Sequence, residues 1–183
     1  MTIGKTRAFA IFCLLICSCD SILCTKADDD GQTLLEEFLI CRSCGADAAI
    51  SNFIFGKLSE KNLVSNNETV FGKEDVLVQI LEYPLGNRFE VVSLKRASCT
   101  RIAAWTTSYS WFSGYAWKLC LCPKCTSHLG WMFEPIETAT ENQIFPSEKG
   151  FYLLIVDSVI AEDELMSHLP WYSPSKFFRE NNI

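Results

Sequence analysis

Two pairs of cysteines, each separated by two residues, carry the clearest chemistry in this chain. Cys41 and Cys44 form the first pair, and Cys122 and Cys125 form the second. A tight turn at each pair aims both sulfur atoms at one point, and four thiolates are the set that Zn²⁺ prefers at structural sites. The sequence therefore predicts one structural zinc that closes a long loop and contributes on the order of 10 kcal/mol to folding.

Disulfide bonds are the alternative for these cysteines, because the chain also has features of a secreted protein. We favour metal, since a disulfide within a CxxC pair is usually a redox feature rather than a structural link. The chain holds only two histidines, at positions 128 and 168, so nothing indicates a catalytic zinc with an open ligand position. We interpret His128 as a structural hydrogen-bonding residue. Cys99 and Cys120 remain, either as a disulfide or as buried free thiols.

Tryptophan is concentrated around the second cysteine pair. Trp111, Trp117 and Trp131 lie within 21 residues of one another. Core packing is one explanation, because indole side chains are large and costly to expose. An aromatic cage is the other: flat walls enclose a small ring, and backbone groups at the mouth fix its orientation.

Longer strings around these residues resemble a known family. Residues 110–117 read SWFSGYAW and residues 122–133 read CPKCTSHLGWMF, which are similar to the CULT domain, the module with which cereblon binds thalidomide. Residues 39–44, LICRSC, resemble the first zinc-binding turn of that family. The pieces follow the family order from about Ile40 to Asp157. The resemblance implies a β-tent, an all-β fold in which two antiparallel sheets meet near a structural zinc.

The same resemblance implies a ligand site. Three indoles form the walls of the cage, Phe133 lies at its base, and the backbone around Ser110 offers C=O and N–H groups to a glutarimide or similar cyclic imide, including a cyclised peptide C-terminus. Tyr109 stands where family members often carry His, so a backbone contact is expected there. The turn at residues 83–86 lacks the Asn that cereblon presents over its pocket, which predicts altered selectivity. The implied ligand-binding residues are Tyr109, Ser110, Trp111, Trp117, Trp131 and Phe133.

The resemblance favours a binding module over an enzyme. The alternative enzyme is a methionine sulfoxide reductase of the B type, which shares the β-tent and its zinc but needs a nucleophilic thiolate in the pocket. Cys99 is the candidate nucleophile, yet its surroundings, residues 96–100, do not match the catalytic string of that family. A third hypothesis is a structural secreted domain that recognises protein partners through its aromatic surface.

The elements that must position these residues are short strands separated by turns. Alternating residues, with turn chemistry at residues 84–87, predict an antiparallel all-β domain. We expect one or two turns of helix within residues 33–40 and an exposed loop at residues 59–68, which carries an N-glycosylation sequon at Asn67. Strands are predicted at residues 76–81, 89–95, 115–122, 130–133 and 150–156.

The ends of the chain have separate features. Residues 1–24 read as a signal peptide, since Lys5 and Arg7 precede a short apolar run, with a signal anchor as the alternative. The prediction is a secreted monomer that does not dock onto a ubiquitin ligase. The formal net charge of −6 and the absence of a basic run argue against nucleic acid. The expected divisions are a signal peptide at 1–24, a polar linker at 25–35, a CULT-like domain at 36–160 and a C-terminal tail at 161–183.

Overall fold

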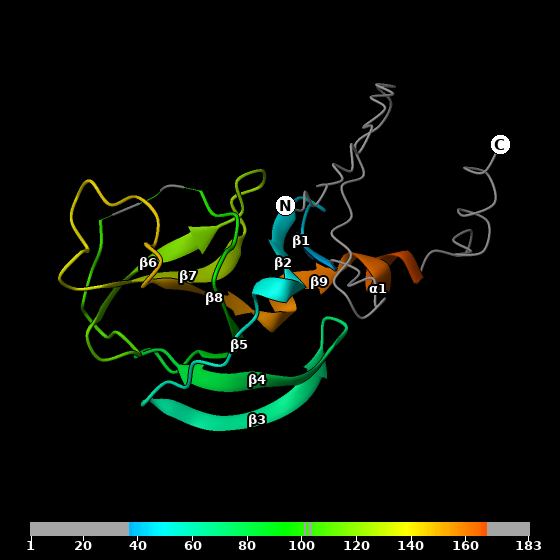
Figure 1. Cartoon of the computed structure of the whole chain (residues 1–183), viewed down its shortest axis with the longest axis horizontal. Coiled ribbons are helices and arrows are strands. Elements are labelled where there is room, and N and C mark those ends of the chain that lie inside the picture. The colour runs from blue at the N-terminus through cyan, green and yellow to red at the C-terminus, as the bar shows by residue number, and fades with distance from the viewer. Residues whose placement is uncertain (1–36, 101, 103, 168–183) are drawn as a thin grey trace, which may run out of the picture. The chain divides into compact units, whose positions relative to one another are not determined.

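Two antiparallel sheets make up the part of the chain that the computed structural model describes, which is residues 37–100, 102 and 104–167 (Figure 1). The predicted all-β class with two antiparallel sheets is confirmed. The smaller sheet has the order β2-β1-β9, formed by β1 (Phe38–Cys41), β2 (Asp47–Ile50) and β9 (Val159–Ala161). The predicted signal peptide, the linker and the tail beyond residue 167 lie outside the described residues.

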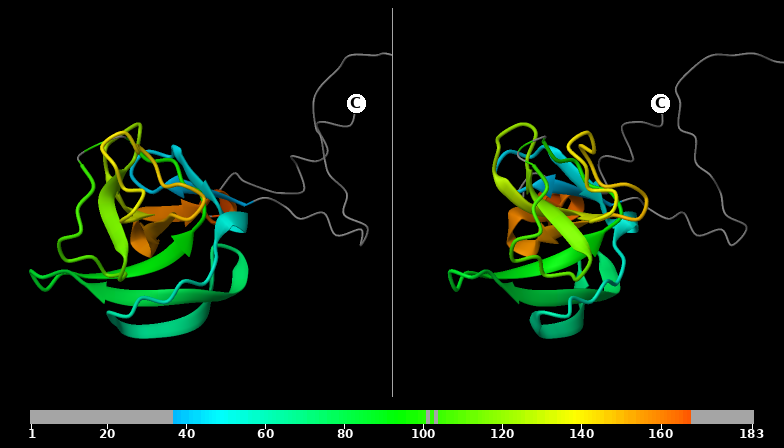
Figure 2. Two further views of the ribbon diagram at one scale, coloured as in Figure 1. Left: turned by 60° about the vertical axis from the view of Figure 1, so that its left-hand side comes forward. Right: turned by 90° about the vertical axis from the view of Figure 1, so that its left-hand side faces the viewer.

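The larger sheet has the order β3-β4-β5-β8-β7-β6. It twists strongly, so that β6 runs at a steep angle to β3 (Figure 2). Three short helices complete the described elements: η1 (Ser51–Phe53), η2 (Val156–Ser158) and α1 (Glu162–Ser167). No helix in the described ranges is long and apolar enough to cross a membrane. The six strands of the larger sheet are β3 (Asn62–Val70), β4 (Lys73–Glu82), β5 (Arg88–Leu94), β6 (Tyr115–Leu121), β7 (His128–Pro135) and β8 (Phe151–Ile155).

The hairpin of β4 and β5 has the turn that the sequence predicts. Gly86 adopts a φ of 84°, and its N–H donates to the Tyr83 carbonyl at 2.7 Å. The Tyr83 N–H in turn donates to the Asn87 carbonyl at 2.8 Å. Since a positive φ is readily adopted only by glycine, Gly86 allows this tight reversal. The turn places the Tyr83 ring beside the tryptophans described below.

Strand β7 lies between β6 and β8 and requires a residue without a side chain at Gly130. Gly130 has a φ of 151° and faces Cys120 on β6 and Leu154 on β8. A Cβ atom at this position would overlap the backbone carbonyl of Leu153. The close approach lets β7 pair on both sides and sets the position of Trp131, the next residue.

Two expectations about local structure are wrong. Residues 38–40 form part of β1 rather than helix, because this strand pairs with both β2 and β9 and fully buries Leu39. Residues 62–68 belong to β3 rather than to an exposed loop. The segment has the polar composition of a loop because β3 is an edge strand, which pairs only with β4 and leaves most of its side chains exposed.

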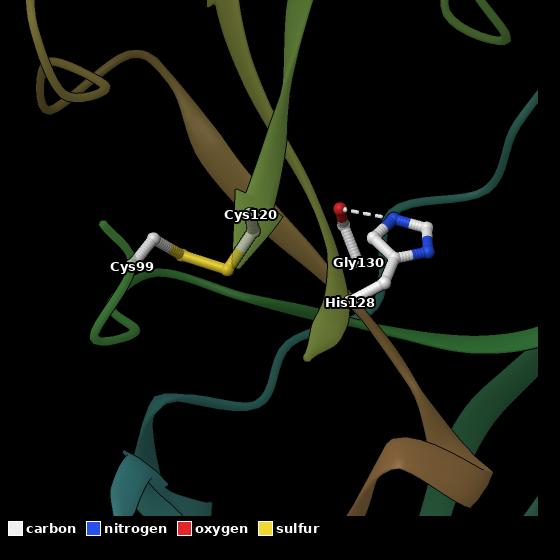
Figure 3. The surroundings of a disulfide bond; sticks show 4 residues. All are labelled: Cys99, Cys120, His128 and Gly130. Carbon is white, nitrogen blue, oxygen red and sulfur yellow. Dashed lines mark hydrogen bonds between the residues drawn. A yellow bond between two sulfur atoms is a disulfide. The ribbon is translucent and has the colours of Figure 1, made fainter. Parts of the chain in front are cut away.

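A disulfide joins Cys99 to Cys120 across 21 residues of sequence (Figure 3). Both residues are buried, and the bond attaches the segment before β6 to that strand. Replacing both cysteines with alanine is expected to lower the free energy of unfolding by about 3 kcal/mol, because the open chain regains loop entropy. Urea denaturation measures this change. An unchanged unfolding midpoint would contradict the expectation.

Candidate functional site

The four cysteines of the two CxxC pairs meet at one point. Cys41 Sγ lies 3.6 Å from Cys125 Sγ, and Cys44 Sγ lies 3.6 Å from Cys122 Sγ. All four sulfur atoms lie within 4.8 Å of one another. Tetrahedral zinc with Zn–S bonds of about 2.3 Å places its ligands roughly 3.8 Å apart. The four thiols therefore fit a structural zinc, and the coordination set that the sequence predicts could hold a metal ion.

The two cysteine turns have the same backbone design. In the first, the Gly45 N–H donates to the Cys41 carbonyl at 2.8 Å, and in the second the Thr126 N–H donates to the Cys122 carbonyl at 2.9 Å. Both closing residues have a left-handed φ, 68° at Gly45 and 61° at Thr126. The repeated local geometry explains how each pair aims both sulfur atoms in one direction although 77 residues separate the two turns.

Hydrogen bonds hold the first turn against the smaller sheet. The Arg42 N–H donates to the Ser158 carbonyl at 3.0 Å, and the Arg42 side chain donates to the carbonyls of Asp157 and Val159 at 3.1 Å each. Cys41 ends β1, whereas Cys122 directly follows β6 of the larger sheet. A metal at this point therefore links the two sheets.

The local environment alters the acidity of the thiols. The Ser127 hydroxyl lies 3.2 Å from Cys125 Sγ and, with the Ser127 backbone, lowers the pKa of Cys125 to about 6. Burial raises the pKa of Cys41. Metal ligation requires thiolates, so the Ser127 groups favour the form of Cys125 that binds metal.

A second feature is a hollow between aromatic rings at the tip of the β4–β5 hairpin, which we call the aromatic hollow. It is narrow, and its walls stand too close together to admit a water-sized sphere. The ring centroids of Trp111 and Trp131 are 4.7 Å apart at an interplanar angle of 80°. The residues that line it are Tyr83, Tyr109, Trp111, Trp117 and Trp131.

Two of the indoles are anchored by their N–H groups. Trp111 Nε1 donates to the Glu82 carbonyl at 2.9 Å, and Trp117 Nε1 donates to the Ser108 carbonyl at 2.8 Å. The Tyr83 ring meets the rings of both indoles edge-on. These bonds fix the ring orientations, so the two walls are arranged without a ligand.

The backbone at the edge of the hollow keeps unused hydrogen-bonding groups. Ser110 is satisfied, because its N–H donates to the Thr107 carbonyl at 3.3 Å and its carbonyl accepts from Lys61 Nζ at 2.6 Å. Within the described residues, the Tyr109 carbonyl and the Trp111 N–H have no hydrogen-bond partner. Tyr109 is 66% exposed and has a left-handed φ of 59°, which is rare for a bulky residue.

The structure brings together most, but not all, of the predicted ligand-site residues. Phe133 does not line the hollow: it is fully buried and stacks on Phe151 with centroids 4.9 Å apart. Ser110 does not line it either, and its hydroxyl donates to the Phe112 carbonyl at 3.0 Å. Tyr83, which the sequence predicts only as part of a turn, forms a wall of the hollow. The sequence feature that could have indicated this role is the aromatic side chain of Tyr83 at the first position of a hairpin turn.

His128 lies outside the four-cysteine group and packs as a structural residue. One ring nitrogen lies 2.9 Å from the Gly130 carbonyl (Figure 3). The ring meets Trp131 edge-on at a centroid distance of 4.6 Å, and burial lowers the pKa of His128. The neutral ring therefore supports the back of the Trp131 side chain.

Cys99, the candidate nucleophile of the reductase alternative, lies in the disulfide with Cys120 and does not line the hollow. Among the described residues, the free cysteines are the four at the metal centre. A reductase of this type needs a thiolate facing its substrate. The geometry therefore provides no support for the reductase alternative.

Comparison with known proteins gives one group of relatives. No family model matches the chain. The chain is 25% identical over 124 residues to "Protein cereblon" of Drosophila willistoni, covering 66% of this chain and 18% of that protein. It is 23% identical over 112 residues to "Protein cereblon" of Drosophila melanogaster, covering 60% of this chain and 17% of the relative. The chain thus matches about a sixth of the length of these relatives.

Proposed function

The chain carries a cereblon-like CULT domain, and from this premise we propose that it is a secreted, zinc-containing binding module for small cyclic imides. The aromatic hollow is the ligand site, and its three tryptophans form a cage. The observation that carries the proposal is the pairing of these rings with the unpartnered Tyr109 carbonyl and Trp111 N–H. A cyclic imide presents acceptor, donor and acceptor along one edge, so it complements these two groups.

The expected affinity comes from the backbone hydrogen bonds at the edge of the hollow and from burial of the ligand ring between the aromatic walls. Each desolvated hydrogen bond contributes roughly 1 kcal/mol net, and burial of the ring adds about 25 cal/mol per Å² of apolar surface. Because the hollow is narrower than a water-sized sphere, entry of a ring requires the walls to separate. The exposed Tyr109 side chain is the wall that moves aside most easily.

Titration with glutarimide, followed by tryptophan fluorescence, tests the proposal. We expect saturable quenching, because three indoles contact the ring. N-methylglutarimide is the matched control: it keeps the ring and both carbonyl groups but lacks the N–H that the Tyr109 carbonyl accepts, so it should bind weakly. Equal responses to the two compounds, or no saturation with either, would overturn the proposed function.

We also propose that the protein enters the secretory pathway and is glycosylated at Asn67. Asn67 is exposed on the edge strand β3, and its Nδ2 donates to Asp75 Oδ1 at 2.7 Å. Expression of the full chain in cultured animal cells should release a protein into the medium whose mass falls on treatment with a peptide-N-glycosidase. Thr69→Ala removes the sequon and keeps Asn67, so this variant should lack the mass shift. Retention of the protein inside the cells would contradict secretion.

A further inference from the structure

A second recess adjoins the aromatic hollow. It has a volume of about 210 Å³ and is open to solvent. Tyr83, Tyr109 and Trp111 line both spaces, so they form a common wall. A ring held in the hollow therefore has room on this side for a substituent. The residues that line the recess are Lys61, Glu82, Tyr83, Pro84, Tyr109 and Trp111.

The recess contains one cation whose charge is not matched by an ion pair. Among its lining residues in the described part of the chain, Lys61 is the only cation and Glu82 the only carboxylate. The Glu82 carboxylate pairs with Arg88 at 2.8 Å, whereas the structure forms no ion pair with Lys61 within the described residues. Glu60, the neighbour of Lys61, does not line the recess, and its carboxylate accepts from the Ser113 N–H at 3.3 Å.

Lys61 is also held in place next to the ligand-binding backbone. Its ammonium donates to the Ser110 carbonyl at 2.6 Å, between the unpartnered carbonyl of Tyr109 and the unpartnered N–H of Trp111. An ammonium has three donors, so two remain for another partner. An anionic group in the recess would be the natural acceptor for them.

We propose that this recess is a substituent subsite through which the module selects cyclic imides that carry a negatively charged group, with Lys61 as the specificity-determining residue. The inference rests on the proposed function, since the ring must occupy the aromatic hollow for its substituent to reach Lys61. Because Lys61 is exposed, its attraction for an anion is modest and is screened by salt.

Two ligands that differ only in charge test the subsite. One is 3-aminoglutarimide acylated with succinic acid, which carries a free carboxylate, and the other is the corresponding terminal amide. At low ionic strength the carboxylate ligand should bind roughly two- to fivefold tighter than the amide ligand, as expected for an exposed ion pair. This ratio should fall toward one in high salt and in the Lys61→Met variant, and it should persist in Lys61→Arg.

The outcomes separate the subsite from the cage. If unsubstituted glutarimide does not bind, the proposed function itself fails, whereas if glutarimide binds and neither substituted ligand does, the recess admits no substituent and the subsite is overturned. If both bind equally to the wild-type protein at low salt, the cage is retained and charge selection is overturned. If Lys61→Met weakens both ligands by the same factor, Lys61 only positions the backbone around Ser110, and the specificity role is again overturned.

Discussion

Replacing Cys125 with serine is expected to abolish metal binding and to unfold the domain. Cys125 supplies one of four sulfur atoms that lie within 4.8 Å of one another and come from two turns far apart in sequence. Zinc at such a site contributes on the order of 10 kcal/mol, and the total stability of a domain is only about 5–15 kcal/mol. Elemental analysis of the purified protein measures zinc per chain, and circular dichroism measures the loss of strand structure.

Two control proteins make the zinc prediction specific. Ser127→Ala removes the hydroxyl beside Cys125 Sγ but keeps four thiols, so it should stay folded with one zinc per chain. The double alanine variant of Cys99 and Cys120 should also keep its zinc, because neither residue belongs to the four-cysteine group. Folded, metal-free Cys125→Ser protein would contradict the prediction. The prediction would also be contradicted if the wild-type protein contained no metal and its four cysteines were oxidised in pairs.

Replacing Trp117 with alanine is expected to reduce the affinity for glutarimide by about tenfold while the domain stays folded. Trp117 is only half-buried and lies on the edge strand β6, so its loss leaves the main core intact. Removing one wall exposes ligand surface worth about 1–2 kcal/mol, which corresponds to roughly tenfold in affinity. Calorimetric titration of the wild-type protein and the variant measures the difference.

Two further tryptophans provide comparison variants. Trp131 is 3% exposed and packs inside the aromatic core, so Trp131→Ala should lose ligand binding and also about 3–5 kcal/mol of stability. Trp105 does not line the hollow, and its Nε1 donates to the Gln143 carbonyl. Trp105→Phe should therefore bind glutarimide like the wild-type protein. Full affinity in Trp117→Ala, or an equal loss in Trp105→Phe, would show that the ring binds elsewhere.

Features that depend on local sequence could be predicted. The β4–β5 hairpin follows from alternating apolar residues and a turn that ends near Gly86, and both signals act over a few residues. The convergence of sulfur atoms within each CxxC pair is also local, since one backbone hydrogen bond closes each turn, from Gly45 to Cys41 in the first and from Thr126 to Cys122 in the second. Cys122 and Cys125 have the same CxxC spacing as Cys41 and Cys44, so the same local turn could be predicted there.

Three features that depend on long-range contacts could not be predicted in full. Residues 62–68 look like a polar loop, yet they form β3 because β4 pairs with this segment antiparallel over most of its length. The wall formed by Tyr83 depends on the hairpin tip meeting Trp111, which lies 28 residues further along the chain. Phe133 was expected below the ligand, and that its ring stacks on Phe151 in the same core as Trp111 and Trp131 could be seen only in the structure.

By itself, the amino-acid sequence determined the residue types of this protein's chemistry: four thiols in two turns and a cluster of indoles. Only the tertiary structure decided which rings face a shared hollow, which aromatic side chains pack in the core and which backbone groups stay unpaired. The physical reason is that turn geometry and strand alternation depend on near neighbours, whereas the partners of a side chain depend on how distant strands pair and pack.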